Sequence, residues 1–524
     1  MVSGVLLRVA CCGKYIFMDE SPILGNIVNF FENRTVIPSH FSYPTLFSYL
    51  AAIPTGLGSV VLHMRGILPS PADIWALFTL DSILPILPAR LTSVFFGTAT
   101  ILATFEIGRR FFNIKTGLIA AALISYSRLH IGYSSYALPD VTTAFFCALS
   151  LFFALSALRT KLVREYVFAG IFAGFAVSTK YNSALMIFPL LFVHLIQIYD
   201  EGRFLSPRAW VNIRIISTGL AFLCSFLIGS PGWLLRPGPF WEALFRERMH
   251  MATGHLGSYG LPYVRHMMLL WGWEKTVAIL FGLGLVYAIF RRDRENTVFL
   301  ALVLPSFLFI GIWQKKDLHY LLFMYPALAL LSGRLFSDVL LKSCSRTRNL
   351  AVLLLLISAF VWPLSSSAIY AYQQTLEDSR WVASRWIQEN IQENSRIVTD
   401  WAYLPMLLTK QQKDKRLNGR HREFYMARLL DIHTYQTIPL VYSKTWLKEI
   451  KADYLITSSY CFERFFRTPA PYPGSGLSYE YSKRKETYDA LFHNRGALGW
   501  SLLKEFHTRK GPRILLYIRC RGQA

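Results

Sequence analysis

Apolar residues along this chain fall into long blocks separated by short polar segments. Ten of these blocks approach the ~20 residues that an α-helix needs to cross a bilayer. The predicted spans are residues 86–108, 116–134, 139–158, 166–180, 183–199, 211–230, 267–290, 296–313, 319–336 and 349–371. The pattern therefore predicts a polytopic integral membrane protein whose transmembrane domain covers residues 86–371 with about ten spans.

Basic residues gather in every second loop between these blocks. The basic loops lie around residues 109–115, 159–164, 203–214, 291–294 and 334–348. Since Lys and Arg concentrate in cytoplasmic loops, these loops are predicted to face the cytoplasm. The less basic loops then face outward, and the parity places both the segment before residue 86 and the tail after residue 371 outside the cytoplasm.

The N-terminal segment is harder to place. Residues 1–13 are too short to span a bilayer and contain Arg8, so we interpret them as the remnant of a first transmembrane helix, truncated or continued by an upstream start. Residues 14–85 are predicted to form the first extracytoplasmic loop. Within it, residues 45–64 are apolar but broken by Pro54. A span there would invert the charge pattern of the later loops, so a juxtamembrane helix at the interface is predicted.

The tail, residues 372–524, is dense in charge and predicts a soluble extracytoplasmic domain. Residues 378–390 have a helical pattern, whereas 395–400, 452–459 and 511–518 read as short strands. The predicted fold class is therefore a mostly α polytopic membrane protein with a small C-terminal extracytoplasmic α/β domain.

Composition agrees with a membrane protein, since 53% of the 524 residues are hydrophobic and only 17% are charged. Lys and Arg number 55 against 32 Asp and Glu, a formal net charge of +23. Two interpretations stay open: the ordinary basic excess of cytoplasmic loops, or attraction to lipid-linked phosphate. The charge is scattered between apolar spans, which disfavours a nucleic-acid partner.

The spacing of the cysteines and histidines gives little support for a metal or redox site. The seven cysteines lack the spacing of zinc or redox CxxC sites. Cys461 and Cys520 are candidates for a disulfide in the tail. His250 and His255 are five residues apart, outside the i,i+4 spacing of a helical metal pair.

Acidic residues of the outward segments are candidates for chemistry. Asp19 and Glu20 lie in the first outward loop, and Asp140 lies at the outer end of the span that begins near 139. An ionised carboxylate there can accept a proton from an acceptor hydroxyl or bind a divalent cation. The alternative is that these carboxylates only cap helix N-termini.

Basic and aromatic residues occur at the same predicted face. Lys180 closes a short span, and the run QKKDLHY places Lys315, Lys316 and His319 just before a late span. Such groups can neutralise a phosphate leaving group, or they can be interfacial anchors. His40 and Tyr43 of the first loop, together with Tyr320, are further predicted to bind substrate.

Taken in order, several segments resemble one family. They are MDESPILGNIVNFF, HFSYPTLFSYL, ARLTSVFFGTATILATFEIGRRFF, GLIAAALISYSRLHIGYSSYALPD, AGIFAGFAVSTKYNSAL and KKDLHYLLFMYPALALLSG, with DSRWVASRWIQENIQENSRIVTD in the tail. The sequence resembles the polytopic GT-C glycosyltransferases, specifically the dolichyl-phosphate-mannose protein mannosyltransferases (family 39) and their bacterial lipid-carrier-dependent relatives.

The resemblance implies roles for individual residues. Asp19 matches the acidic position of the presumed catalytic base, with Glu20 beside it, and Asp140 matches the second outward acidic position. The basic position before the late span maps onto Lys315, Lys316 and His319, although relatives often have arginine there. No cofactor is certain; Asp19 and Asp140 are candidate ligands for a divalent metal cation.

The predicted function is thus inverting glycosyl transfer from a polyprenyl-phosphate-linked sugar to a hydroxyl of a protein, lipid or glycan acceptor. The lipid bilayer is the other partner, and the predicted location is the plasma (inner) membrane with the active site and C-terminal domain outside the cytoplasm. The main alternative is a polytopic transporter or lipid-carrier flippase, which would place ionisable groups near the bilayer midplane. A non-catalytic membrane scaffold is the third.

Overall fold

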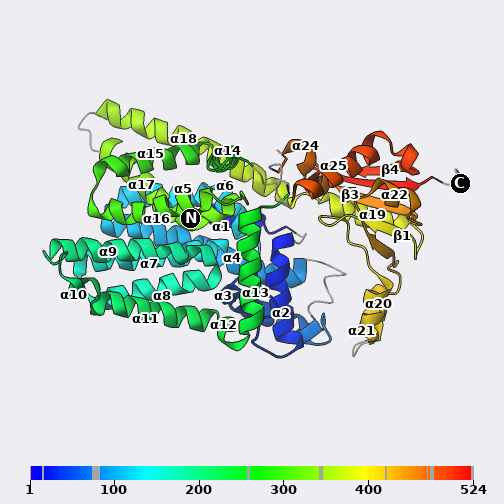
Figure 1. The fold of residues 1–524 in the computed structure, drawn as a ribbon, viewed down its shortest axis with the longest axis horizontal. Coiled ribbons are helices and arrows are strands. Elements are labelled where there is room, and N and C mark those ends of the chain that lie inside the picture. The colour runs from blue at the N-terminus through cyan, green and yellow to red at the C-terminus, as the bar shows by residue number, and fades with distance from the viewer. Residues whose placement is uncertain are drawn as a thin grey trace.

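A computed structural model describes residues 2–13, 17–73, 83–256, 260–340, 346–418, 422–468, 470–471 and 477–520. A bundle of long helices is joined to a small α/β domain that carries the C-terminus (Figure 1). This architecture confirms the predicted fold class.

Helical elements of the N-terminal segment precede the long helices. They are α1 (Val2–Ala10), the 3-10 helix η1 (Met18–Glu20), α2 (Ser21–Glu32) and α3 (Leu46–Met64). Buried Arg8 of α1 donates to the carbonyl oxygen of Ile124 at 3.0 Å and to Ser134 Oγ at 3.2 Å. The charge that interrupts this short apolar segment therefore attaches α1 to the bundle.

The bundle and its connections are built from helices. They are α4 (Ile83–Phe111), α5 (Ile114–Tyr126), α6 (Arg128–Ser134), α7 (Asp140–Thr160), α8 (Val163–Thr179), η3 (Tyr181–Met186), α9 (Ile187–Asp200), α10 (Pro207–Trp210), α11 (Ile213–Gly229), α12 (Gly232–Leu235), α13 (Pro237–Thr253), α14 (Val264–Glu274), α15 (Thr276–Arg291), α16 (Arg294–Gly311), η4 (Leu318–Met324), α17 (Tyr325–Leu335), the π-helix η5 (Phe336–Leu340) and α18 (Arg346–Thr375).

Each predicted span contains helix, and within the described ranges seven helical segments are long and apolar enough to cross a membrane. Two predicted spans, 116–134 and 267–290, were wrong as single helices. The first is broken at Ser127, whose extended backbone ends α5 and whose side chain accepts the His130 N–H to begin α6. The second is broken at Lys275, where φ is +36°.

One helix of the first outer segment, α3, is among these seven segments. Its early turns lie beside the outward-predicted ends of α8 and α11, because a Cβ on Gly229 would meet Leu46 at 3.4 Å. Farther along α3, Gly58 lies against Pro88 near the start of α4. The length and hydropathy of α3 suit a membrane span. Its position at the interface stays a prediction from the charge pattern of the loops.

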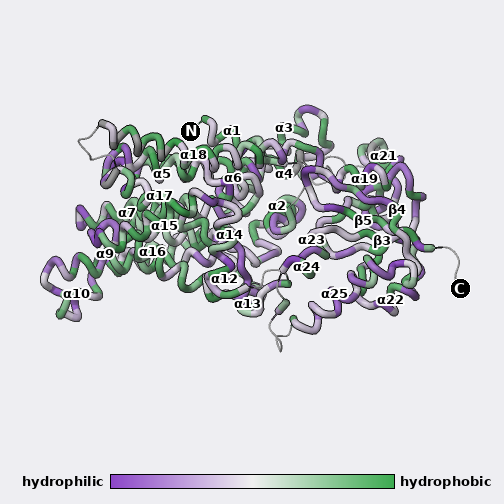
Figure 2. Tube along the Cα trace, turned by 90° about the horizontal axis from the view of Figure 1, so that it is seen from above, coloured by the Kyte–Doolittle hydropathy of each residue, from purple (hydrophilic) through white to green (hydrophobic). Residues whose placement is uncertain are grey.

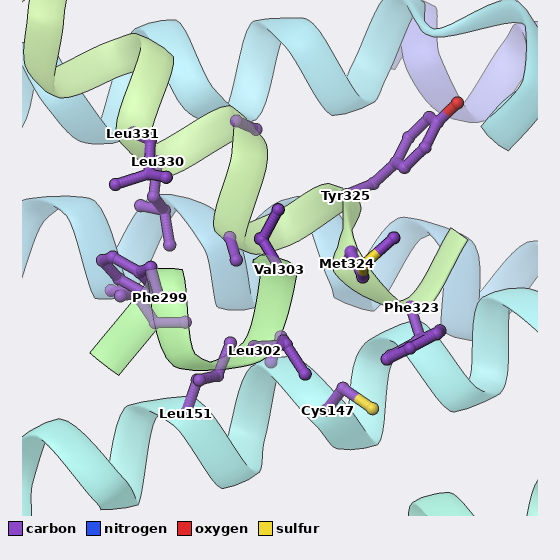
Figure 3. Packing of buried hydrophobic residues seen from close by; sticks show 14 of the residues in the cluster. Cys147, Leu151, Phe299, Leu302, Val303, Phe323, Met324, Tyr325, Leu330 and Leu331 are labelled. Carbon is purple, nitrogen blue, oxygen red and sulfur yellow. The ribbon is translucent and has the colours of Figure 1, made fainter. Parts of the chain in front are cut away.

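The bundle core is apolar and closely packed. Side chains from α7, α16, η4 and α17 interdigitate around Leu302 and Met324 (Figure 3). Hydrophobic residues dominate the long helices, whereas hydrophilic stretches are frequent in the α/β domain (Figure 2). Helices α2 and α13 run across the end of the bundle that faces the α/β domain, and α18 leads into that domain (Figure 1).

The α/β domain contains a five-stranded sheet in the order β2-β1-β3-β5-β4. Its strands are β1 (Arg396–Thr399), β2 (Gln436–Pro439), β3 (Tyr454–Ser458), β4 (Trp500–Phe506) and β5 (Ile514–Arg519). Its helices are α19 (Ser379–Asn390), α20 (Lys410–Leu417), α21 (Arg422–Leu429), α22 (Lys444–Glu449), α23 (Ser459–Phe462), α24 (Arg464–Arg467), α25 (Ser478–His493) and η6 (Gly496–Leu498).

Four strands of this sheet run in one direction, and β5 runs in the opposite one. Val398 of β1 pairs with Ile438 of β2 and Leu455 of β3, both parallel, whereas β5 is antiparallel to β3 and β4. Alternate residues enter two buried clusters: Ile397 packs with α19, and Val398 packs with α25. Both faces of the sheet are therefore covered, as parallel strands require.

The sequence predicted β1, β3, β5 and α19 and missed β2 and β4. Both missed strands are sheet edges, and β2 is mostly exposed and ends at Pro439, so neither has the continuous apolar run of a central strand. The disulfide considered for Cys461 and Cys520 is absent, because both are free thiols.

The packing of α8 on α11 generates a stability prediction. A Cβ on Gly174 would collide with the carbonyl oxygen of Phe222 and with Ser225 Oγ, whereas Gly219 of α11 has nothing within 4 Å of its Cβ position. Gly174→Ala should destabilise the protein by about 1–3 kcal/mol through overpacking. The matched Gly219→Ala should be neutral or stabilising because alanine favours helix. Thermal unfolding in detergent measures both, and equal melting temperatures would contradict this packing.

Candidate active site

Glu20 and Arg90 form a buried ion pair that holds η1 against α4. The Glu20 carboxylate accepts from Arg90 Nε at 2.8 Å and from Nη2 at 2.6 Å. It also accepts the backbone N–H groups of Phe17 and Ala137, each at 2.7 Å. Neither side chain is accessible to solvent. Glu20, predicted beside the base, thus has both carboxylate oxygens engaged in holding η1 in place.

Asp19, the residue before Glu20, is half-buried. Burial raises the pKa of its carboxyl, and the ammonium group of Lys315 opposes the rise. The carboxyls of Asp317 and Asp140 raise this pKa further, and Lys180 lowers it. The structure therefore brings Asp19 and Asp140, which are far apart in the sequence, within electrostatic range of one another.

Asp140 and Lys180 form a second buried pair at the ends of two adjacent helices. Asp140 is the first residue of α7, and Lys180 follows the last residue of α8. The Lys180 ammonium donates to Asp140 Oδ1, and it lies 4.9 Å from the centroid of the Tyr320 ring. One turn farther along α7, the hydroxyl groups of Thr143 and Thr179 are 2.7 Å apart and join the same helices.

The loop 312–317 between α16 and η4 supplies further charge. Its Gln314 N–H donates to the Met251 carbonyl at 2.9 Å, which attaches the loop to α13. Lys315 Nζ lies 5.8 Å from the Tyr320 ring centroid. Burial raises the pKa of Asp317, and the nearby Lys315 opposes that rise. The loop therefore carries a cation and a carboxyl to the site of Asp19.

Tyr43 lies within electrostatic range of the carboxyl groups of this site. Burial raises the pKa of its phenol well above the usual value, and the charges of Asp19, Asp140 and Glu247 add to the rise. Burial also raises the pKa of Glu247 on α13. His40 differs: it is exposed, and its Nδ1 lies 2.9 Å from Ser39 Oγ. The structure thus brings Tyr43, but not His40, to the carboxyl cluster.

Lys316 is buried, and its charge acts on His266. Its ammonium donates to the Gly311 carbonyl at 3.2 Å. His266 on α14 is fully buried, and neither ring nitrogen has a hydrogen-bond partner in the described structure. The same holds for Arg265 Nε, and the Arg265 charge acts on Asp317. Buried donors without partners are costly, so this place suits an anion.

The rings of His319 and Tyr320 contact each other at the start of η4. His319 Nδ1 lies 3.0 Å from the Tyr133 hydroxyl, and its ring centroid lies 4.1 Å from that of Tyr320. The Tyr320 carbonyl accepts from Asn182 Nδ2 at 2.9 Å. The ammonium groups of Lys180 and Lys315 therefore both lie within 6 Å of the centroid of the Tyr320 ring.

Asp19 and Asp140 stay predicted candidates for a divalent cation, and Lys180 already pairs with Asp140. The ammonium of Lys180 occupies Asp140 and would repel a cation placed between Asp140 and Asp19. Among the residues that the structure describes, no three His, Cys, Asp or Glu side chains are grouped as metal ligands. Burial lowers the pKa of His250 and of His255 to about 4, and His255 Nδ1 lies 3.2 Å from Arg464 Nη1.

The sequence assigned no role to several residues of the site. Asp317 was visible inside the run QKKDLHY, next to the basic residues that were singled out. Glu247 and Arg265 had no local signal, because their helices α13 and α14 approach the site only through tertiary packing. Arg90 reads as an ordinary residue at a span end, and only its pairing with Glu20 distinguishes it.

Solved structures share this architecture. ArnT from Cupriavidus metallidurans bound to undecaprenyl phosphate matches with a TM-score of 0.51 at 14% identity, over 98% of this chain and 96% of that one. The apo state of the same protein matches with a TM-score of 0.50 over the same shares of the two chains. The chain has the GT-C glycosyltransferase fold. The fold that the resemblance implied is thereby confirmed.

Sequence comparison matches parts of this chain. The family model described as dolichyl-phosphate-mannose-protein mannosyltransferase matches residues 74–228. An uncharacterized protein of Aquifex aeolicus (strain VF5) is 24% identical over 289 residues, 53% of this chain and 54% of the relative. The match therefore spans about half the length of that relative.

The Glu20–Arg90 pair generates a second stability prediction. Glu20→Gln leaves the Arg90 charge buried without its counterion, which should cost about 3–5 kcal/mol. Glu106→Gln is the matched control, because the Arg109–Glu106 side chains are 53% and 38% exposed and exposed pairs contribute about 0.2–1 kcal/mol. Denaturant unfolding in micelles measures both variants. A loss at Glu20 no larger than the loss at Glu106 would show that the pair does not hold the loop.

Proposed function

We propose that this chain is an inverting glycosyltransferase that moves a sugar from a polyprenyl-phosphate donor to an acceptor hydroxyl, with Asp19 as the base. The observation that carries the proposal is the convergence of Asp19, Asp140, Lys180 and Lys315 at one end of a GT-C fold. The family match over residues 74–228 supports glycosyl transfer, and the ArnT structure with bound undecaprenyl phosphate supports the class of donor.

The proposed reaction forms one bond at the anomeric carbon of the sugar and breaks another. Asp19 accepts the proton of the acceptor O–H while the oxygen forms a bond to the anomeric carbon. The bond from that carbon to the donor phosphate oxygen breaks, and its electron pair leaves with the phosphate. Attack on the face opposite the departing phosphate inverts the anomeric centre. A base with a raised pKa suits this step, because proton transfer is most effective when the pKa approaches the working pH.

Cations would stabilise the departing phosphate. Lys315 is the first candidate, because Lys180 is already neutralised by Asp140. Two further cations are near: the Arg265 charge acts on Asp317, and the Lys316 charge acts on His266. An anion placed there would also engage the buried donors of Arg265 and His266 that have no partner in the described structure. Developing negative charge is stabilised most by such preoriented groups.

The site is proposed to face the extracytoplasmic side. Asp140 begins α7 and Arg159 lies near its end; a helix of 21 residues is about 30 Å long, close to the thickness of the hydrocarbon core. Arg159 belongs to the basic loops predicted to be cytoplasmic. The catalytic end of the bundle would then lie in the opposite leaflet, with the α/β domain outside.

A transporter or flippase remains the rival function. Such proteins place ionisable groups near the bilayer midplane. Here the groups of the site lie at helix ends: Asp140 begins α7 and Lys180 follows α8. This placement favours chemistry at a membrane surface over passage through the membrane.

Substitution of the base tests the proposal. Asp19→Asn removes the proton acceptor and should lower transfer at least 100-fold, since general-base catalysis contributes roughly 10²–10⁴-fold. Glu32→Gln in the same loop, an exposed residue outside the carboxyl cluster, should retain activity. Mass spectrometry of products formed by purified protein from a panel of polyprenyl-phosphate sugars measures both. Full transfer by Asp19→Asn, or no transfer by the wild type with any donor, would overturn the proposal.

The pH dependence gives a second test of the site. Asp19 must be ionised to accept a proton, so kcat/KM should fall as the pH drops through its raised pKa, above the ordinary value of about 3.9. Lys315 lowers this pKa. Lys315→Gln should therefore move the acid limb of the kcat/KM profile to higher pH, and it should also weaken binding of the donor phosphate. A limb that stays in place or moves to lower pH in Lys315→Gln would contradict the assignment of the base.

A further inference from the structure

A cavity of about 220 Å³ lies where the helix bundle meets the α/β domain. We call it the junction cavity; its lining includes Phe17, Arg90 and Tyr136 from the membrane domain and Tyr403, Tyr460 and Lys510 from the α/β domain. At ~30 Å³ per water molecule, its volume equals about seven waters. It is smaller than the ~300–1,000 Å³ pockets of drug-sized ligands, so it suits one small ring.

Aromatic rings form two walls of the junction cavity. Phe17 stacks on Tyr136 with ring centroids 4.7 Å apart. On the domain side, the rings of Tyr403 and Tyr460 are 4.0 Å apart, and Phe17 and Tyr403 meet edge to face at 6.1 Å. Such rings offer apolar faces together with phenol groups that hydrogen-bond.

Charged groups complete the lining. Arg380 donates to Asp378 through Nε at 2.8 Å and Nη2 at 2.7 Å. Lys510 donates to the Gln374 carbonyl at the end of α18. The turn after Lys510 needs glycine, because Gly511 has a φ of +86° and a Cβ there would meet Asp378 Oδ1 at 2.5 Å. The polar side of the cavity is therefore built from rigid, mutually bonded groups.

The junction cavity borders the site of Asp19. Met18, the residue before Asp19, donates its N–H to the Tyr403 hydroxyl at 3.5 Å. The Asp19 charge also acts on the phenols of Tyr403 and Tyr460, contributing to the rise of their pKa values that burial begins. A ring bound against Tyr403 and Tyr460 would thus lie next to the proposed base.

The domain presents these tyrosines at the place where α/β sheets bind ligands. The chain passes from β1 to β2 on one side and then to β3 on the other, so the direction of winding reverses at β1. Tyr403 follows the carboxyl end of β1 and Tyr460 follows that of β3. Crevices at such switch points are the usual ligand sites of open parallel sheets.

We propose that the junction cavity binds one sugar ring of the acceptor, so that the acceptor is a saccharide, free or part of a glycolipid. This inference rests on the proposed function. Aromatic faces pack against the apolar C–H faces of a sugar, and the charged groups opposite them bond its hydroxyl groups. A peptide acceptor fits less well, because peptides are recognised mainly along sheet edges or helix grooves, whereas this cavity lies at strand ends.

The test compares two sets of acceptors with the full chain in nanodiscs. One set is the methyl glycosides of glucose, galactose and N-acetylglucosamine, and the other is a set of Ser- and Thr-containing peptides. Transfer from the polyprenyl-phosphate sugar that the wild type uses should go to a saccharide. Tyr460→Ala and Lys510→Met should each raise the KM for that saccharide at least tenfold, with less than a twofold change in the donor KM. Tyr460→Phe, which keeps the ring, should stay within threefold.

A matched control and a binding assay complete the design. Tyr479→Ala is the control, because this tyrosine of the same domain is 76% exposed and lies outside the cavity lining. Saturation-transfer NMR with the same glycosides should show binding to Asp19→Asn and loss of binding in Asp19→Asn combined with Tyr460→Ala. Transfer to peptides alone, or a saccharide KM that neither cavity variant changes, would overturn the inference. Failure of glycosyl transfer itself is distinguishable, because the wild type would then consume no donor while the NMR assay would still report on the cavity.

Discussion

The buried pair of Glu20 and Arg90 determines where the candidate active site can form. Glu20 accepts four hydrogen bonds, two from Arg90 and two from backbone N–H groups, one of which lies just before α7. These bonds join η1, α4 and the approach to α7. Because a buried ion pair tolerates little displacement, the adjacent residue Asp19 is held at the end of the bundle where Asp140 begins its helix.

The remaining charges of the site are arranged around that point by helix ends. Lys180 ends α8 and pairs with Asp140, while the loop after α16 is attached to α13 through the Met251 carbonyl and carries Lys315. Helix ends near a membrane surface can hold ionised groups at lower cost than helix centres. The apolar packing of the bundle thus gives a rigid frame on which acids and bases from distant segments meet.

The α/β domain adds a second layer to the same site. Tyr403 and Tyr460 follow strand ends of this domain, and the Tyr403 hydroxyl accepts the Met18 N–H. Arg464 donates to the carbonyl of Leu256, a residue that follows α13, at 2.8 Å. The docking encloses a small aromatic and charged cavity beside Asp19.

The sequence alone determined the long apolar helices and the α/β tail and singled out the acidic residues Asp19 and Asp140, because apolar block length and loop charge are local properties of the chain. It did not reveal that Glu20 pairs with Arg90, that Lys180 is neutralised by Asp140, or that Glu247 and Arg265 join the site. Nor did it predict the helix break at Lys275 or the edge strands β2 and β4. Which charges meet, and which remain available for chemistry, depends on how helix ends far apart in the chain pack together, and only the tertiary structure decides that.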